Sequence, residues 1–211
     1  MPKIKLPTKT PHIDMTPMVD LFALLLTFFM LTATIRPQEP APVDTPFSVS
    51  EKSSPDANIM TVVLSPDSRV FFNIDNGPDT ILHFRPKILA EMGKRYNIEF
   101  TPQELRKFEK YGASIGVDIK DMKAFLAVKD PALKIQYEKG GIPIDSTDNQ
   151  MAMWVLFARQ VNPSVQALIK GDNDVPYPIV KKVLDILQDK NVNRFSLITS
   201  LEKVEVIDAK K

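Results

Sequence analysis

Residues 15–35 read MTPMVDLFALLLTFFMLTATI, and this stretch decides how the chain is organised. A helix needs about 20 mostly apolar residues to cross a bilayer, and this run is long enough. We therefore predict a single N-terminal transmembrane helix over residues 15–36. Asp20 is the one ionisable residue in the quoted stretch, and its presence needs an explanation.

The position of Asp20 predicts a role in moving protons. A carboxylate near the centre of a bilayer costs about 2.5–3.5 kcal/mol on insertion scales, and acids at such depth commonly mark ion or proton routes. An apolar surrounding disfavours the charged form of a carboxyl group, as reversible protonation requires. The alternative is a structural aspartate paired with a lysine or arginine of another subunit.

Helical spacing places small and polar residues on the Asp20 side of this segment. Such residues let membrane helices approach closely and form hydrogen bonds across the contact. We expect this face to contact protein or a hydrated cavity, with the Leu/Phe face toward lipid. Thr27 either assists proton transfer or bonds back to a carbonyl one turn earlier, and Thr34 is expected to bond back. The residues proposed for the proton path or the helix contact are Thr16, Ala23, Thr27 and Thr34.

The distribution of positive charge predicts the orientation. Lys3, Lys5 and Lys9 precede the apolar run, and little positive charge follows closely beyond Arg36. Positive residues stay on the cytoplasmic side, so the N-terminus should lie inside the cell and the rest in the periplasm of a Gram-negative cell. A cleaved signal peptide is the alternative, but the run is long and no clear A-x-A site follows it.

The segment before the helix is polar and contains several prolines. Pro17 fits the first turn of the helix and Thr16 its N-cap. Asp14 is expected either to cap or to contact a partner at the cytoplasmic interface. His12 is interpreted as a plain interfacial residue rather than a proton relay.

Composition limits the possible chemistry. The 211 residues carry a net charge of +1 and contain no cysteine, which argues against broad nucleic-acid binding and excludes disulfides and thiol catalysis. The two histidines are far apart, and we find no catalytic triad, metal-ligand cluster or phosphate-binding glycine loop. We therefore predict a protein that is not an enzyme and has no cofactor or metal, with protons as coupling ion.

Residues 13–20, Ile-Asp-Met-Thr-Pro-Met-Val-Asp, resemble the start of the ExbD/TolR family of inner-membrane proteins. Its members begin with a short cytoplasmic tail and a motif ending in a proton-carrying aspartate, which corresponds to Asp20. The resemblance implies a homodimer inside a ring of a polytopic ExbB/TolQ-like protein. It also implies a periplasmic domain that acts on a TonB-like protein spanning the periplasm.

The end of the chain is similar to the same family. Residues 164–172 read as a buried strand, 175–188 as an amphipathic helix and 194–199 as another strand. Earlier, residues 60–64 and 69–74 predict a hairpin with a turn between them. The expected fold is α+β: two main helices on one face of a β-sheet.

The middle departs from short family members, which pass quickly from the hairpin to a single helix. Residues 84–145 look like an inserted helical segment of open role. A capping box at Thr101 predicts a helix to about Tyr111, and residues 121–128 predict a short one. A further helix is expected from Thr147 or Asp148 through Gln160, with four residues on its buried side. These four are Met151, Trp154, Val155 and Ala158.

These predictions divide the chain into five parts. They are a cytoplasmic tail (1–14), the transmembrane helix (15–36), a Pro-rich periplasmic linker (37–58), the α+β domain (59–205, with 84–145 inserted) and a C-terminal tail (206–211). The linker composition favours an extended, mobile segment. Residues 47–50 have strand character and could instead pair with a sheet edge.

The predicted function is a subunit that couples the proton motive force at the inner membrane to a TonB-like protein, energising outer-membrane import. One alternative is a TolR-like motor subunit for envelope maintenance. Another is a non-motor, membrane-anchored periplasmic binding module, for which an apolar helix without Asp20 would suffice.

Overall fold

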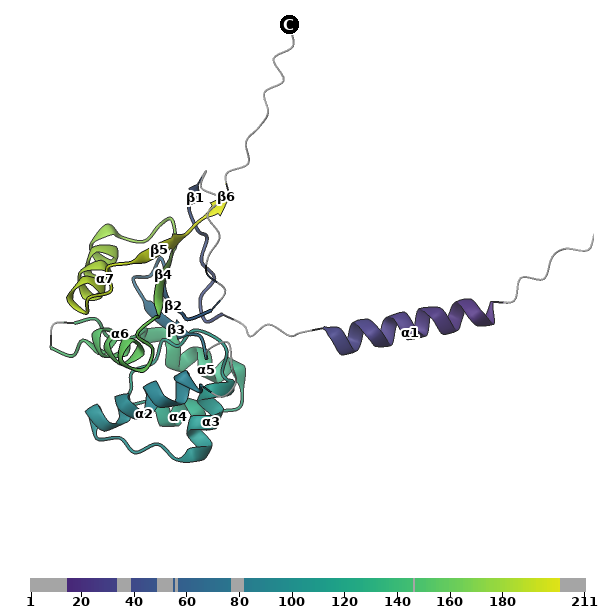
Figure 1. Ribbon diagram of the computed structural model, residues 1–211, viewed down its shortest axis with the longest axis horizontal. Coiled ribbons are helices and arrows are strands. Elements are labelled where there is room, and N and C mark those ends of the chain that lie inside the picture. The colour runs from purple at the N-terminus through teal and green to yellow at the C-terminus, as the bar shows by residue number, and fades with distance from the viewer. Residues whose placement is uncertain are drawn as a thin grey trace, which may run out of the picture. The chain divides into compact units, whose positions relative to one another are not determined.

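The computed structural model describes residues 15–33, 39–48, 55, 57–76, 82–145 and 147–201. The chain divides into two units, residues 1–36 and 37–211 (Figure 1), which are considered separately. Asp14, His12 and Thr34 lie outside the described residues.

The first unit contains helix α1, Thr16–Thr32. Pro17 lies in its first turn, as predicted, but the N-cap is Met15 and no side chain caps the helix. The expectation that Thr16 is the N-cap is therefore wrong by one residue, because its backbone is already helical. Judged by length and mean hydropathy, none of the helices within the described residues meets the requirement for crossing a membrane. The transmembrane helix over residues 15–36 stays a prediction.

The second unit is built on a mixed sheet in the order β3-β2-β4-β5. Strands β2 (Ile59–Leu64) and β3 (Val70–Ile74) form the predicted antiparallel hairpin. Strand β4 (Gln166–Gly171) runs parallel to β2, with Val62 opposite Ile169, and β5 (Phe195–Ile198) runs parallel to β4. Helix α7 (Tyr177–Asp189) lies between β4 and β5 in the chain, so the predicted strand-helix-strand end of the domain is confirmed.

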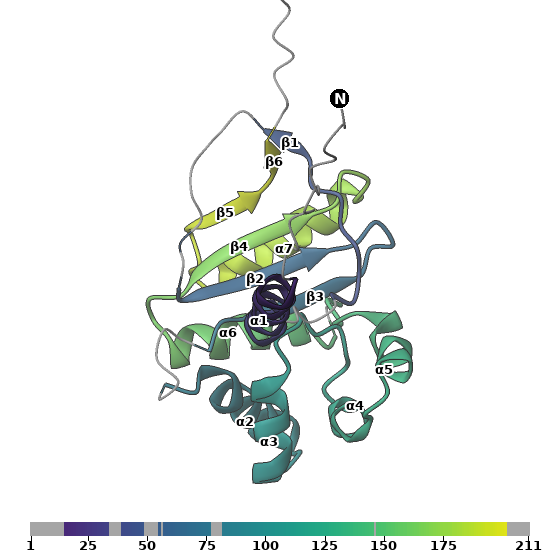
Figure 2. The same cartoon turned by 90° about the vertical axis from the view of Figure 1, so that its right-hand side faces the viewer.

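Helices α6 (Gln150–Val161) and α7 (Tyr177–Asp189) pack against the sheet and lie at its lower and far sides in Figure 2. Alternate residues of β2 and β4 point at them, because successive side chains of a strand face opposite sides. All four residues expected on the buried side of α6 are buried. The shared core includes Met60, Val62, Trp154, Ala167, Ile169, Val183 and Leu187.

Residues 84–145 form four α-helices and a short 3-10 helix. These are α2 (Phe84–Tyr96), α3 (Pro102–Lys110), α4 (Met122–Ala127), α5 (Pro131–Tyr137) and η1 (Glu138–Gly140). The predicted helices at 101–111 and 121–128 are confirmed, including the capping box between Thr101 and Glu104. Ile88, Leu89 and Met92 of α2 belong to the same core as α6, so these helices are part of one domain. Whether the segment is an insertion relative to shorter members stays a prediction.

Residues 39–48, which we call the strap, lie against the domain. Strand β1 (Phe47–Ser48) at the end of the strap pairs in parallel with β6 (Ser200–Leu201). Ala41 is buried with Val63 and Phe71, on the face of the sheet that α6 and α7 leave uncovered. Part of the segment expected to be a mobile linker is thus packed, and Phe47 and Ser48 form the strand pairing held open as the alternative.

The strap is also held by polar contacts. Lys170 Nζ lies 2.9 Å from Glu39 Oε2, the backbone N–H of Asp44 donates to Asp172 Oδ2 at 2.8 Å, and the hydroxyls of Thr45 and Ser200 lie 2.6 Å apart. Sequence patterns did not indicate these contacts, because each joins residues more than 120 positions apart.

Candidate functional site

Helix α1 brings most of the predicted proton-path residues onto one side. Thr16, Ala23 and Thr27 stand four, three and seven positions from Asp20, and such spacings share a helix face. Thr27 Oγ1 donates to the carbonyl of Leu24 at 2.9 Å. From the sequence, this bond to the preceding turn was the alternative to a proton-transfer role for Thr27. The Thr27 hydroxyl is therefore hydrogen bonded within its own helix.

The apolar side chains of α1 are exposed in the isolated chain. Leu31 is 87% exposed and Met30 75% exposed, and no residue of the helix is buried. A continuous apolar surface of this kind marks a protein or membrane interaction site.

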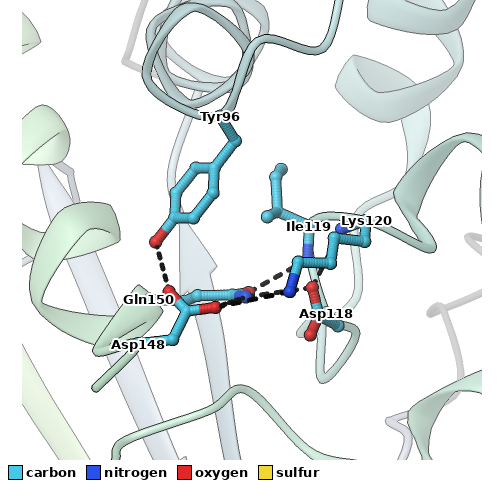
Figure 3. A network of polar contacts seen from close by, with 6 residues as sticks. All are labelled: Tyr96, Asp118, Ile119, Lys120, Asp148 and Gln150. Atoms are coloured by element: carbon cyan, nitrogen blue, oxygen red, sulfur yellow. Dashed lines mark hydrogen bonds and ion pairs between the residues drawn. The ribbon is translucent and has the colours of Figure 1, made fainter. Parts of the chain in front are cut away.

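A polar network in the second unit joins three segments that are distant in sequence (Figure 3). Gln150 is fully buried at the start of α6, and its Nε2 donates to Asp118 Oδ1 and Asp148 Oδ2, both at 2.9 Å. Its Oε1 accepts from the backbone N–H of Ile119 at 3.0 Å, and Tyr96 Oη donates to Asp148 Oδ1 at 2.8 Å.

The charged and polar groups of this network satisfy one another, which indicates a structural role. The hydrogen bond from Gln150, followed by that from Tyr96, holds the pKa of Asp148 below its usual value. Burial, with the bond to Asp148, raises the pKa of Tyr96 to about 12. The polar groups bind one another, so the network ties the end of α2 and the 118–120 loop to α6 and needs no outside ligand.

Glu138 is a second buried ionisable group. It is 2% exposed and accepts a hydrogen bond from Tyr111 Oη at 3.1 Å. Burial raises the pKa of Glu138 to about 7, against smaller lowering effects of Tyr111 and Lys134. The Lys134 ammonium lies 4.5 Å from the centre of the Tyr111 ring. Glu138 therefore changes charge near neutral pH, which makes it a determinant of stability.

No group of three metal-ligating side chains was found within the described residues. The two buried groups discussed here, Gln150 and Glu138, were not singled out from the sequence. A buried glutamine has no local sequence signal, and Glu138 lies in a charged stretch, Lys139 following it, that reads as exposed.

The fold and the first helix together define the class: an α+β domain preceded by an apolar helix that carries one carboxyl group. A family model described as biopolymer transport protein ExbD/TolR matches residues 7–202. The chain therefore belongs to the ExbD/TolR family, which confirms the resemblance drawn from residues 13–20. No curated protein and no solved structure matches the chain.

Membership of the ExbD/TolR family indicates the general role of the chain. The family is membrane-anchored and has an energy-coupling role in biopolymer transport. Its members generally work with ExbB/TolQ and TonB/TolA partners. The match spans both units, so the apolar helix and the domain belong to one family architecture.

Proposed function

We propose that this chain is a proton-carrying motor subunit that couples the inner-membrane proton motive force to a TonB-like protein and so energises outer-membrane import. Asp20 accepts a proton from one side of the membrane and releases it to the other. The observation that carries the proposal is this single carboxyl group on a mostly apolar helix, in a chain of the ExbD/TolR family.

The proposed topology is a single pass, with the N-terminus in the cytoplasm and the domain in the periplasm. Helix α1 has 17 residues, and spans of about 17–25 residues are found in bilayers. The sequence continues the apolar run past the helix with Ala33, Thr34 and Ile35. The exposed apolar surface of α1 would then be covered by lipid and by partner helices.

One helix cannot form a sealed proton path, so partners are part of the proposal. The small and polar side chains beside Asp20 suit close packing against a second copy of α1. The pair would sit inside a ring of an ExbB/TolQ-like protein. Each proton that crosses releases about 2.3 kcal/mol per 100 mV of membrane potential, which can drive a conformational cycle of the ring and the helix pair.

The strap offers a route by which motion reaches the domain. It follows α1 in the chain and is bonded to the domain through Glu39, Asp44 and β1. A displacement of α1 that reaches residue 39 would therefore act on residues that are bonded to the domain. The same proton chemistry would serve a Tol-type output, and identifying which TonB- or TolA-like protein co-purifies with the chain distinguishes the two.

The test is Asp20→Asn in cells that depend on energised import. We expect import to fall to the level of a strain that lacks the gene, because asparagine cannot carry a proton. Asp20→Glu should retain part of the activity. The matched control is Asp185→Asn on the exposed side of α7, which should import normally. Normal import by Asp20→Asn at normal protein abundance would defeat the proposal.

A further inference from the structure

Residues 128–140, which we call the flap, are attached to the domain with a single buried side chain. The flap contains α5 and η1, and no residue of α5 is buried. Glu138 is the one buried residue of the flap and is 2% exposed. The chain on either side is firmly packed, since Leu126 is 4% exposed and Ile142 is 3% exposed. The flap is therefore a mostly exposed segment between two fixed ends.

Two side chains of the flap contact the ring of Tyr111. Lys134 Nζ lies 4.5 Å from the centre of this ring and 5.2 Å from the centre of the Phe125 ring. The Tyr111 hydroxyl donates to Glu138 Oε1 at 3.1 Å. Because a cation–π contact near the surface contributes little, the state of the Glu138 carboxyl group should govern how firmly the flap is held.

The surroundings of Glu138 favour its neutral form. Burial raises the pKa of Glu138 to about 7, against the smaller lowering effects of Tyr111, Lys134 and Arg69. Burial also raises the pKa of Tyr111, so its hydroxyl stays protonated as a donor. Glu138 forms no ion pair within the described residues. The charged groups on the elements around it are Arg69 before β3, Lys129 and Lys134 of the flap and Glu39 of the strap.

A cavity of about 220 Å³ lies between the flap and the rest of the domain. Ile135 and Glu138 line it from the flap, and Tyr111, Ala113 and Pro40 line it from the domain and the strap. Ala113 is 3% exposed. An outward movement of the flap would open this cavity and bring water to the Glu138 carboxyl group.

We propose that the flap is a pH-sensitive latch, which the neutral Glu138 carboxyl group holds shut and which opens more often when this group loses its proton. A buried carboxylate is unfavourable, and opening returns it to water. In the open flap, the pKa of Glu138 should be about 4.3, so the closed flap binds the proton more tightly. Closure is therefore strongest in mild acid and weakens as pH rises through about 7. The latch is separate from Asp20 and does not depend on the proposed proton transfer.

The experiment measures how often the cavity opens, by maleimide labelling of Ala113→Cys in the full chain in detergent. The natural chain contains no cysteine, so the introduced thiol is the one that reacts. At each pH its labelling rate is divided by that of Gln136→Cys, an exposed position on α5, which removes the effect of thiol ionisation. The ratio should rise about 10- to 100-fold from pH 5 to pH 8, because the pKa of Glu138 differs between the closed and open flap.

A second variant ties this rise to Glu138. Ala113→Cys combined with Glu138→Gln should keep the ratio constant within about threefold, because an amide accepts the Tyr111 bond without ionising. The matched control adds Glu99→Gln, at an exposed position, and should show the full rise. Unfolding curves confirm that each variant is folded.

Amide hydrogen exchange locates the opening. Exchange of residues 133–138 in the unmodified chain, corrected for the intrinsic rate at each pH, measures the opening of the flap without a substitution and should show the same pH dependence. The open fraction should be at least about tenfold larger than the one obtained from the core amides of α6, which report unfolding of the whole domain. The amide of Asp44, bonded to Asp172, reports the strap and should not change in step with the flap.

Four results would overturn the proposal. The first is a labelling ratio that does not rise between pH 5 and pH 8, and the second is an equal rise with Glu138→Gln. The third is an open fraction equal to that of α6, which would mean unfolding of the whole domain. The fourth is a parallel rise in exchange at Asp44, which would assign the opening to the strap.

Discussion

Gln150 and Asp118 are joined by a hydrogen bond of 2.9 Å between amide Nε2 and carboxylate Oδ1, although 32 positions separate them. The same amide donates to Asp148, so two carboxylates converge on one fully buried side chain. Their negative charges are held near each other by the donor between them. The helices of residues 84–145 are thereby fastened to the start of α6.

Replacing Gln150 should destabilise the domain. Gln150→Leu leaves two carboxylates and the Ile119 N–H without their shared partner, and the loss should be about 2–4 kcal/mol of unfolding free energy. Gln150→Glu adds a third carboxyl group to the cluster. Chemical unfolding monitored by Trp154 fluorescence measures both.

The pH dependence of the Gln150→Glu variant separates charge repulsion from lost packing. Repulsion should weaken as pH falls from about 7 to 4 and the introduced carboxyl group, which lies beside two carboxylates, takes up a proton, so the variant should approach the unmodified chain in acid. Gln150→Leu should show no such recovery. A Gln150→Leu protein as stable as the unmodified chain would contradict the structural role of the network.

Gly116 packs against the ring of Phe71. A Cβ at this position would lie 2.2 Å from Phe71 Cδ1, far inside contact distance. Gly116→Ala should lower the unfolding free energy by about 1–3 kcal/mol through overpacking. Gly140→Ala is the matched control, because nothing lies within 4 Å of its Cβ position, and it should change stability little. Equal effects of the two substitutions in thermal unfolding would refute the packing described here.

Glu138 should make the domain more stable in mild acid. Its pKa is about 7 in the folded chain and about 4.3 in an unfolded one, so the folded state binds the proton more tightly. Between these two values the folded state holds more protons, and stability falls as pH rises. We expect Glu138 to contribute a loss on the order of 2 kcal/mol between pH 5 and 8, measured by chemical unfolding at each pH.

Glu138→Gln is the decisive variant for this effect, since an amide can accept the Tyr111 bond without ionising. Its stability should vary less with pH between 5 and 8 than that of the unmodified chain. Glu99→Gln, at an exposed position, should keep the original slope. The acids whose pKa is lowered, such as Asp148, act in more acidic solution and do not contribute in this window. An unchanged slope in Glu138→Gln would rule out the assignment.

A charged residue in place of Ala41 should detach the strap from the sheet. Ala41 is 2% exposed and contacts the apolar pair Val63 and Phe71, so Ala41→Glu would bury an unpaired carboxylate. Amide hydrogen exchange at Asp44 and Asn173, whose N–H groups are bonded across the contact, should become at least tenfold faster. The neighbouring exposed position provides the control, Pro42→Glu, which should leave exchange unchanged. Slow exchange at both amides in Ala41→Glu would show that the strap stays packed.

The sequence predicted the elements that have strong local signals. The β2–β3 hairpin was indicated by apolar strands around Ser65–Ser68, and α3 by the capping box at Thr101. Helix α2 was missed because it follows a left-handed His83 without a side-chain cap and contains Pro86 and Gly93, two helix breakers. Helix α5 was also missed, although Asp130 caps it and a proline follows, which is a signal that could have been used.

The same difference between local and long-range signals decides which candidate sites could be predicted. Asp20 could be singled out because an acidic residue within an apolar run can be recognised from the sequence alone. Gln150 and Glu138 could not, since their importance comes from burial by segments far away in sequence. The strap was interpreted as linker from its prolines, whereas its pairing with β6 depends on residues more than 150 positions later.

The most direct test of the central claim is the protonation state of the Asp20 carboxyl group in the complex assembled with its ring partner. Infrared spectra of the complex with and without Asp20→Asn should differ by one carboxyl band. We predict that this band converts between the neutral acid and the carboxylate over the pH range that cells experience. A band that remains that of a carboxylate at every pH would show a permanently ionised, structural aspartate and would contradict the account.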